Sequence, residues 1–220
     1  MPPSATLEDI KAYQDKVEKN QIRPHDLPPC PRCSVESCFF KTHTYRERRF
    51  LVIVKMLIQA AFCSLIQFRC PGCGKTVTYY PDFAIPHKHY TRQSIMGFSA
   101  IYVENDNMTY KQAVMTEDGT PGYPQSDSTL APSTLHRWIT TLGGFIQSTQ
   151  KALSLVLQEN PASSVCRDLS HLSIPQQKYR KPARQETLLS CLRLVLIESF
   201  FQATFKRSIF IKLAIHCAFS

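Results

Sequence analysis

The chain has 220 residues, which is room for one large domain or for two to three small modules. Hydrophobic residues make up 43% and charged residues 20%, a globular composition that argues against wholesale disorder. The formal net charge of +9 favours an anionic partner, either nucleic acid or an anionic membrane surface. Residues 151–220 hold 10 Lys and Arg against 4 Asp and Glu, so the excess charge is concentrated toward the C-terminus.

The sequence lacks the patterns of a secreted or membrane-spanning protein. Residues 1–20 are polar and mixed in charge, unlike a cleavable signal sequence. The apolar segment 50–68 approaches the about 20 residues that span a bilayer, but it lies between two cysteine pairs. Segment 188–219 is interrupted by five charged residues. We therefore expect no membrane partner, reduced thiols and a cytoplasmic, nucleoid-associated location.

Residues 1–27 are expected to form an N-terminal helix. Leu7, Ile10, Tyr13 and Val17 recur at helical spacing, which gives the segment one apolar face. Arg23-Pro24 then ends the helix, because the residue before a proline disfavours the helical conformation.

Residues 28–86 carry two cysteine pairs, Cys30-Pro-Arg-Cys33 and Cys70-Pro-Gly-Cys73, which predict one structural Zn²⁺. Zinc takes four thiolates tetrahedrally, and each Cys-x-x-Cys turn supplies one edge of that tetrahedron. The site is closed and therefore organises a fold without catalysing a reaction. A disulfide, unused thiols, or a redox or iron–sulfur role are the alternatives. The roles of Cys38 and Cys63 stay open, with surface or core positions favoured over ligation.

The sequence between the two cysteine pairs is rich in β-branched and aromatic residues and predicts a hairpin with arms around 50–54 and 65–69, followed by a strand at 76–80. Thirty-six residues separate the pairs, more than the common spacing of about 15–20 residues, so the arms must be extended. Cations of the first arm would reach phosphate from this hairpin, namely Lys41, Arg46, Arg48 and Arg49. An equally weighted alternative is that these charges are only solvated and contact no phosphate.

Residues 87–158 have the order of a helix-turn-helix. A helix is expected from Thr91 to about Glu104, a short one from Thr109, and a third from Ser133 to about Gln158 with a break at Gly143-Gly144. Ser133 is predicted as the N-cap of the third helix. An inward face would consist of Leu135, Trp138, Ile139 and Leu142.

The outward face of that third helix is the predicted reader of a DNA groove. It would present Ser133, Thr134, His136 and Arg137 toward base edges. Further phosphate contacts are expected from Lys111, Arg92 and Lys88. Residues 116–131 form a loop much longer than the usual turn of about 3–4 residues, so the motif would be expanded. A three-helix bundle that binds protein is the alternative interpretation.

Residues 159–184 are predicted to be a basic linker, and residues 185–220 a C-terminal apolar helix. The linker holds Lys178, Arg180 and Lys181 beside Tyr179, which would follow phosphates while the ring stacks on a base. A solvated linker is equally compatible with this composition. The C-terminal helix is too apolar to stand alone and is expected to pack on the preceding helices or on a second copy.

Parts of residues 28–142 resemble a known class of proteins. The runs Phe40–Arg46 and Phe68–Thr76 are similar to the N-terminal zinc ribbons of bacterial insertion-sequence transposases and their DNA-binding accessory subunits. Tyr90–Gln93 and Ser133–Trp138 match the helices that follow in an uncharacterised zinc-ribbon family. The resemblance implies recognition of mobile-element ends or promoters. Residues 143–220 are too short and too helical for the catalytic domain of such transposases.

Together these patterns predict an α+β protein in which a small zinc-ribbon β module precedes a mainly α, helix-turn-helix-like region and a C-terminal helical segment. The expected function is zinc-dependent binding of duplex DNA in transposition or transcription regulation, with the ribbon as an auxiliary contact. The chain is not expected to be an enzyme. A homodimer or a transposition partner protein is compatible with the sequence. The alternatives are a protein-binding scaffold and the non-catalytic N-terminal part of a split or truncated transposase.

Overall fold

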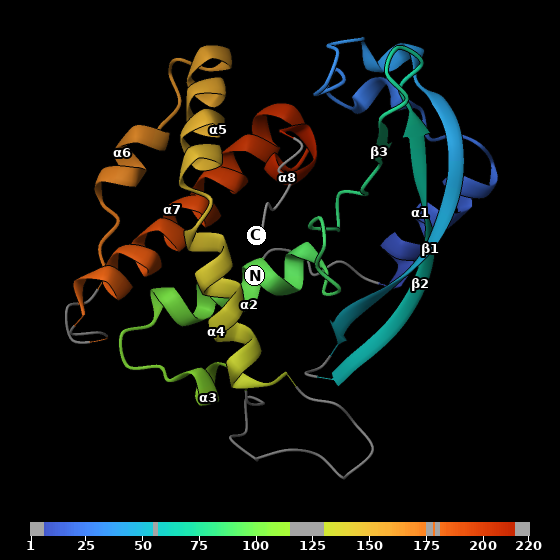
Figure 1. Ribbon diagram of the computed structural model, residues 1–220. Coiled ribbons are helices and arrows are strands. Elements are labelled where there is room, and N and C mark those ends of the chain that lie inside the picture. The colour runs from blue at the N-terminus through green and yellow to red at the C-terminus, as the bar shows by residue number, and fades with distance from the viewer. Residues whose placement is uncertain (1–6, 55–56, 115–129, 175–177, 179–180, 214–220) are drawn as a thin grey trace.

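The computed structural model describes residues 7–54, 57–114, 130–174, 178 and 181–213. The fold is mixed α+β, with one antiparallel sheet on one side and a group of packed helices on the other (Figure 1). We call residues 7–80 the hairpin module and residues 92–213 the helical body, with residues 81–91 as the connector. The predicted α+β class is thereby confirmed.

The sheet is a long hairpin with a short third strand. β1 (Lys41–Val54) pairs antiparallel with β2 (Leu57–Arg69), and β3 (Thr76–Thr78) pairs with the far end of β2, so that β2 is central. At about 3.3 Å per residue, 14 residues make β1 a strand of about 45 Å. The predicted arms lie inside these strands, which are as extended as the spacing of the cysteine pairs requires.

α1 (Leu7–Glu18) packs on β2 and closes the core of the hairpin module. Its apolar residues at helical spacing, Ile10, Tyr13 and Val17, are all buried, as the sequence pattern predicts. The ring of Tyr13 meets the edge of Phe83 from the connector at 5.8 Å. Two short 3-10 helices, η1 (Pro24–Asp26) and η2 (Ser37–Phe39), lead into β1.

The helical body contains seven of the described helices. They are α2 (Arg92–Glu104), α3 (Tyr110–Ala113), α4 (Pro132–Gly143), α5 (Ile146–Glu159), α6 (Val165–Ser170), α7 (Pro182–Phe205) and α8 (Ile209–Lys212). The three helices expected between residues 91 and 158 are present, and the break falls at Gly143-Gly144. The predicted inward face of α4 is confirmed, since Leu135, Trp138, Ile139 and Leu142 are buried in the main core.

Gly143, at the end of α4, packs closely against α7. A Cβ at Gly143 would lie 2.5 Å from the backbone oxygen of Thr187 in α7, closer than any real contact. The absence of a side chain therefore lets α4 and α7 meet at this point. The sequence predicts a helix break at this glycine, and the structure shows that α4 and α7 also touch there.

Three details of the predicted helices are wrong. Ser133 is not the N-cap of α4, because the helix begins one residue earlier, with Pro132 in its first turn after Ala131. The predicted linker 159–184 contains α6. The C-terminal segment is not one helix, because α7 ends where Lys206 adopts a left-handed φ of 55°, and α8 follows.

α7 is the central helix of the helical body and packs against α2, α4, α5 and α6. Among the described residues it is the one helix long and apolar enough, by length and composition, to cross a membrane, and 39% of its most apolar window is buried. It also carries Glu198, a buried carboxylate that pairs with Arg92 of α2. These contacts are those of a core helix.

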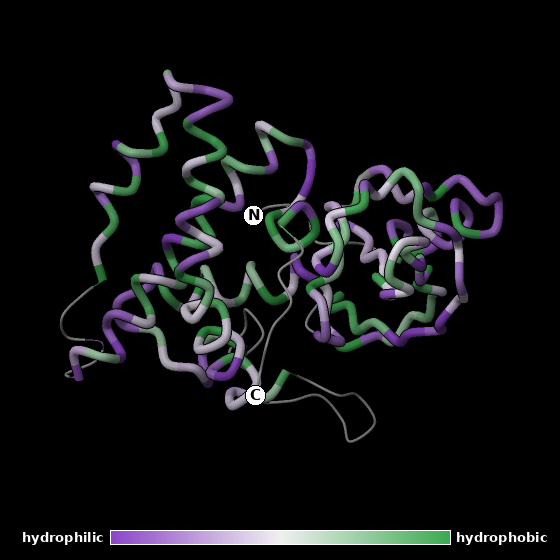
Figure 2. Tube along the Cα trace, turned by 45° about the horizontal axis from the view of Figure 1, so that its top comes forward, coloured by the Kyte–Doolittle hydropathy of each residue, from purple (hydrophilic) through white to green (hydrophobic). Residues whose placement is uncertain are grey.

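Hydrogen bonds fix the end of the connector on β1 and join the hairpin module to the helical body. The N–H of Leu51 in β1 donates to the carbonyl of His89 at 2.8 Å, and Thr91 donates back to Leu51 at 3.1 Å. From the other side, Arg207 beyond α7 donates to the hydroxyl of Tyr79 at 3.0 Å. Figure 2 shows long hydrophilic stretches on the side of the hairpin module that faces away from the helical body.

Candidate metal centre and nucleic-acid surfaces

The two cysteine pairs adopt the same turn. In the first, Cys30 N–H donates to the Val35 carbonyl at 2.8 Å, and Ser34 N–H donates back to Cys30 at 2.8 Å. In the second, Cys70 donates to Lys75 at 2.9 Å, and Gly74 donates back to Cys70 at 3.0 Å. Ser34 and Gly74 occupy equivalent positions with φ of 57° and 72°. The chain thus builds one metal-binding turn twice, the second time with the glycine that a left-handed φ favours.

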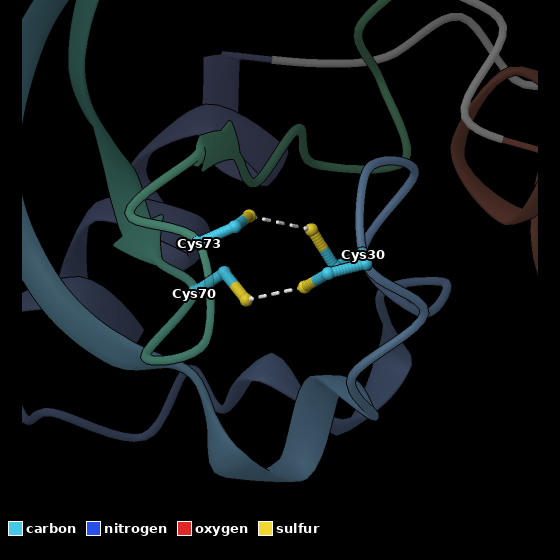
Figure 3. Close-up of side chains that lie close together, drawn as sticks. Cys30, Cys70 and Cys73 are labelled. Atoms are coloured by element: carbon cyan, nitrogen blue, oxygen red, sulfur yellow. Dashed lines mark hydrogen bonds between the residues drawn. The ribbon is translucent and has the colours of Figure 1, made fainter.

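The turns bring four sulfur atoms together (Figure 3). Sγ of Cys30 lies 3.5 Å from that of Cys73, and Sγ of Cys33 lies 3.5 Å from that of Cys70. All four lie within 4.8 Å of one another. A tetrahedral metal with bonds of about 2.3 Å places its sulfurs about 3.8 Å apart, so the set fits a single structural metal ion.

The pKa values of Cys30 and Cys33 are shifted in opposite directions. The backbone of Arg32 lowers the pKa of Cys30 to about 6. The backbone of Val35 also favours the thiolate of Cys33, but burial and the neighbouring sulfurs outweigh it and raise that pKa to about 12. Four thiolates so close together repel one another, and a divalent cation removes that repulsion.

The other cysteines stand apart from this cluster. Cys63 is buried in the hairpin core, where burial raises its pKa to about 12, and Cys38 is exposed. The eight cysteines among the described residues are all free thiols. In the described part of the chain the four sulfurs of the two turns form the one cluster of metal-binding side chains.

α4 presents a polar face to solvent. Ser133, His136 and Arg137 are exposed and Thr134 is half-buried, on the side away from the buried leucine and tryptophan. Nε of Arg137 donates to the carbonyl of Ser133 at 3.3 Å, which holds the side chain along the helix start. His136 meets the ring of Tyr110 edge-on at 5.4 Å. Burial, followed by the charge of Arg184, lowers the pKa of His136, so the imidazole is neutral near pH 7.

α3 is tied to α2 and α4. Thr109 and Gln112 form a reciprocal capping box at its start, as the Thr-x-x-Gln spacing favours. The ring of Tyr110 stacks on Tyr102 of α2 with centroids 4.0 Å apart, and Lys111 stays exposed.

Arg184 of α7 joins the same surface. It donates to the hydroxyl of Thr140 in α4 at 2.9 Å and to the hydroxyl of Tyr110. Its position in a run of basic residues suggested a solvated linker, but the beginning of α7 at Pro182 places it beside α3 and α4.

Arg92 is not available to DNA, and the prediction that it contacts phosphate is wrong. The side chain is buried and its guanidinium lies 2.9 Å from a carboxylate oxygen of Glu198. Nε of Arg92 also donates to the Asp82 carbonyl at 2.7 Å. Both groups of the pair are surrounded by protein, and this burial lowers the pKa of Arg92 and raises that of Glu198. Arg92 therefore joins α2, α7 and the connector.

The sequence predicts that the basic segment at residues 178–184 is exposed to solvent, and this holds for only part of it. Lys178 donates to the carbonyls of Tyr102 and Asn105 at the end of α2, and its Nζ lies 3.8 Å from the centroid of the Tyr102 ring. Burial lowers the pKa of Lys178 to about 8. The prediction that Lys178 follows phosphates from a solvated linker is therefore wrong. Lys181 is exposed, whereas Tyr179 and Arg180 lie outside the described residues.

The hairpin cations divide into two groups. Lys41, Arg46 and Arg49 are exposed along β1. Arg48 is half-buried: it donates to the carbonyl of Lys88 at 3.1 Å, and its guanidinium lies 5.7 Å from the ring centroids of both Phe50 and Tyr80. Arg48 thus fastens the connector to β1, and this contact replaces the expected one to phosphate. Lys88 in turn donates to Thr141 of α4 at 3.4 Å.

Comparison with protein-family models, with curated proteins and with solved structures yields no match for this chain. We therefore infer the function from the arrangement of the described residues. Two features stand out, the four-sulfur cluster and the exposed polar surface at the start of α4.

Proposed function

We propose that this chain is a non-catalytic, zinc-stabilised protein that binds duplex DNA through the exposed face of α4, in the manner of an expanded helix-turn-helix. The single observation that carries the proposal is the composition of that face. It offers Ser133, His136 and Arg137 to solvent, with Lys111 of α3 exposed nearby. Neither α3 nor α4 contains an acidic residue, so no carboxylate on these helices would repel a phosphate.

The packing of the three helices supports a reading role for α4. α2, α3 and α4 all touch one another, and the buried leucine and tryptophan of α4 fix which side of the helix faces out. Residues near the N-terminus of a recognition helix are those that meet base edges in the major groove. The positive end of the helix dipole lies at the same place and favours an approaching phosphate.

The metal we propose is one Zn²⁺ per chain. Four thiolates in a small tetrahedral cage are the ligand set that zinc takes in structural sites, and Cys30, Cys33, Cys70 and Cys73 fill every coordination position. When bound, the ion would cross-link the two ends of the hairpin and supply folding free energy, without an open position for substrate. The zinc-ribbon module would then provide an auxiliary contact to the DNA backbone, in addition to the contacts of α4.

The setting we propose is a mobile element in the cytoplasm, associated with the nucleoid, where the protein acts in transposition or in transcription regulation. Of the runs that resemble transposase zinc ribbons, Phe68–Thr76 contains the second cysteine turn, and the Ser133–Trp138 run lies at the start of α4. The chain would act as a homodimer or with a catalytic partner protein.

A salt titration of duplex binding tests the proposal. Zinc-loaded protein should bind labelled duplex DNA with an affinity that falls steeply as salt rises. Arg137→Ala should weaken binding by roughly 5- to 100-fold, as expected for loss of a base contact. Arg193→Ala is the matched control, because Arg193 is an exposed cation on α7. Absence of duplex binding at low salt, or equal losses in the two variants, would overturn the proposal.

A further inference from the structure

The first half of β1 is the uncovered part of the sheet. Near its second half, the connector runs alongside: Leu51 is hydrogen-bonded to His89 and Thr91, and the ring of His89 contacts the carbonyl of Arg49 at 3.3 Å. Among the described residues, the edge of the first half forms no such backbone hydrogen bond to another segment. Each side chain from Lys41 to Glu47 is exposed.

The opposite edge of the hairpin is covered at residues 64–69. β3 pairs with the end of β2, and Tyr79 donates its N–H to the Ile66 carbonyl at 2.8 Å. Farther along, the N–H of Ser64 donates to the side-chain oxygen of Gln14 in α1 at 2.9 Å. Residues 64–69 of β2 are thus covered, whereas the first half of β1, the strand that carries most of the hairpin's charge, is open at its edge.

One face of this hairpin presents aromatic rings to water. Tyr45, Glu47 and Arg49 alternate along β1 on that face, and the register places Ser64 opposite Glu47 and Phe62 opposite Arg49. Phe62 is 58% exposed and Tyr45 49% exposed, although both are large enough to contribute to a core. We call these five residues the hairpin face.

The register gives the spacing of the two rings. Tyr45 and Arg49 are four residues apart, about 13 Å along a strand, so the rings of Tyr45 and Phe62 stand at the two ends of the face. The Tyr45 hydroxyl donates to the side-chain oxygen of Asn20 after α1 at 3.3 Å, which holds that ring in place. Glu47 and Ser64 lie between the two rings, and exposed rings on a β-surface can stack on unpaired bases.

The charge on the hairpin selects an anionic partner. β1 and β2 together carry Lys41, Arg46, Arg48, Arg49 and Arg69, against the single carboxylate of Glu47. Even without Arg48, which is bound to the connector, the exposed cations of the hairpin outnumber the carboxylate, with Arg49 on the hairpin face and Arg46 on the opposite one. An acidic peptide would satisfy the cations but would leave the two rings without a flat partner. Unpaired bases satisfy both, because each base offers a flat π-face and each linkage carries a phosphate.

We propose that the hairpin face binds single-stranded nucleic acid, with Tyr45 and Phe62 stacking on unpaired bases and Arg49 neutralising an adjoining phosphate. In duplex DNA the base faces are already stacked on one another, so the exposed rings favour strands that are open. This surface is separate from the α4 face, since the hairpin and α4 belong to different parts of the molecule (Figure 1). It adds a second class of nucleic acid to the duplex proposed for α4.

The test compares a labelled oligothymidylate with a duplex of equal length, using full-length zinc-loaded protein and fluorescence anisotropy. Tyr45→Ala and Phe62→Ala should each weaken oligothymidylate binding by roughly 5- to 100-fold, as expected for loss of one base–ring stack. Tyr45→Phe keeps the ring and should retain most of the affinity. Ile146→Ala is the control for loss of an exposed apolar side chain, since Ile146 is 47% exposed on α5.

The outcomes separate the two proposals. Single-strand binding that depends on Phe62 and Tyr45 but not on Arg137 supports the hairpin face whether or not duplex binds. No oligothymidylate binding, unchanged affinity in both alanine variants, or equal competition by polyglutamate would overturn it. Duplex binding that persists and depends on Arg137 would leave the α4 proposal standing in that case. Both rings are exposed, so each variant should keep its fold, and thermal unfolding of each variant checks this.

Discussion

Arg92 shows how a single residue can look functional in the sequence and be structural in the fold. It follows Tyr90-Thr91 at the start of a helix, where an exposed arginine would face phosphate. Its partner, Glu198, is 106 residues away in sequence, and nothing local marks the two as a pair. Glu198 also accepts the N–H of Ile209 at 2.9 Å, so the pair reaches α8 as well. Removal of one partner from a buried ion pair is strongly destabilising, because the other charge stays buried without compensation.

Removal of Arg92 should therefore cost stability. We expect Arg92→Met to lower the free energy of unfolding by roughly 3–5 kcal/mol, because the Glu198 carboxylate stays buried without its cation. The double variant Arg92→Met with Glu198→Leu should be less destabilised than the single one. Urea unfolding of the zinc-loaded protein measures both. A loss below about 1 kcal/mol in the single variant would contradict the structural role assigned to this pair.

At the scale of elements, the features that depend on residues close together in the sequence could be predicted from it. The cysteine turns, the α1 face, the α2 bounds and the inward face of α4 all follow from spacing within a few residues. The start of α7 and the presence of α6 did not, because they depend on packing against α2, α4 and α5. Lys178 was misplaced for the same reason: its carbonyl partners end a helix more than 70 residues earlier.

Two glycines in the helices should respond in opposite directions to the same substitution. Gly143→Ala places a Cβ 2.5 Å from the backbone of Thr187, so we expect a loss of roughly 1–3 kcal/mol as α4 and α7 move apart. Gly97→Ala meets nothing within 4 Å in the middle of α2 and should add roughly 0.5–1 kcal/mol of stability. Chemical denaturation gives both values. Equal effects at the two sites would refute the close approach of α4 to α7.

For the whole molecule, the structure joins two cores through the connector. The hairpin core contains Cys30 and Cys70 themselves, so the metal centre is part of its packing. The core of the helical body is built around α7 and α4. This arrangement predicts that metal removal acts first on the hairpin module, at the opposite end of the chain from α7.

Metal content is measurable directly. The purified protein should carry one zinc per chain, and replacement by Co²⁺ should give the absorption of a four-thiolate tetrahedral site. Cys70→Ser should abolish stoichiometric binding and lower the thermal unfolding temperature. Cys38→Ser is the matched control, because Cys38 is an exposed thiol outside the cluster. Equal loss of zinc in the two variants, or a metal-free protein with unchanged unfolding, would contradict the assignment.

The proposal of DNA recognition by α4 meets its most direct test in selection of bound sequences from a random duplex pool with zinc-loaded protein. The account predicts enrichment of a defined sequence, and loss of that enrichment in Arg137→Ala although the variant keeps its zinc and its fold. Retention of the same enriched sequence in Arg137→Ala, or no enrichment with the unaltered protein, would contradict it.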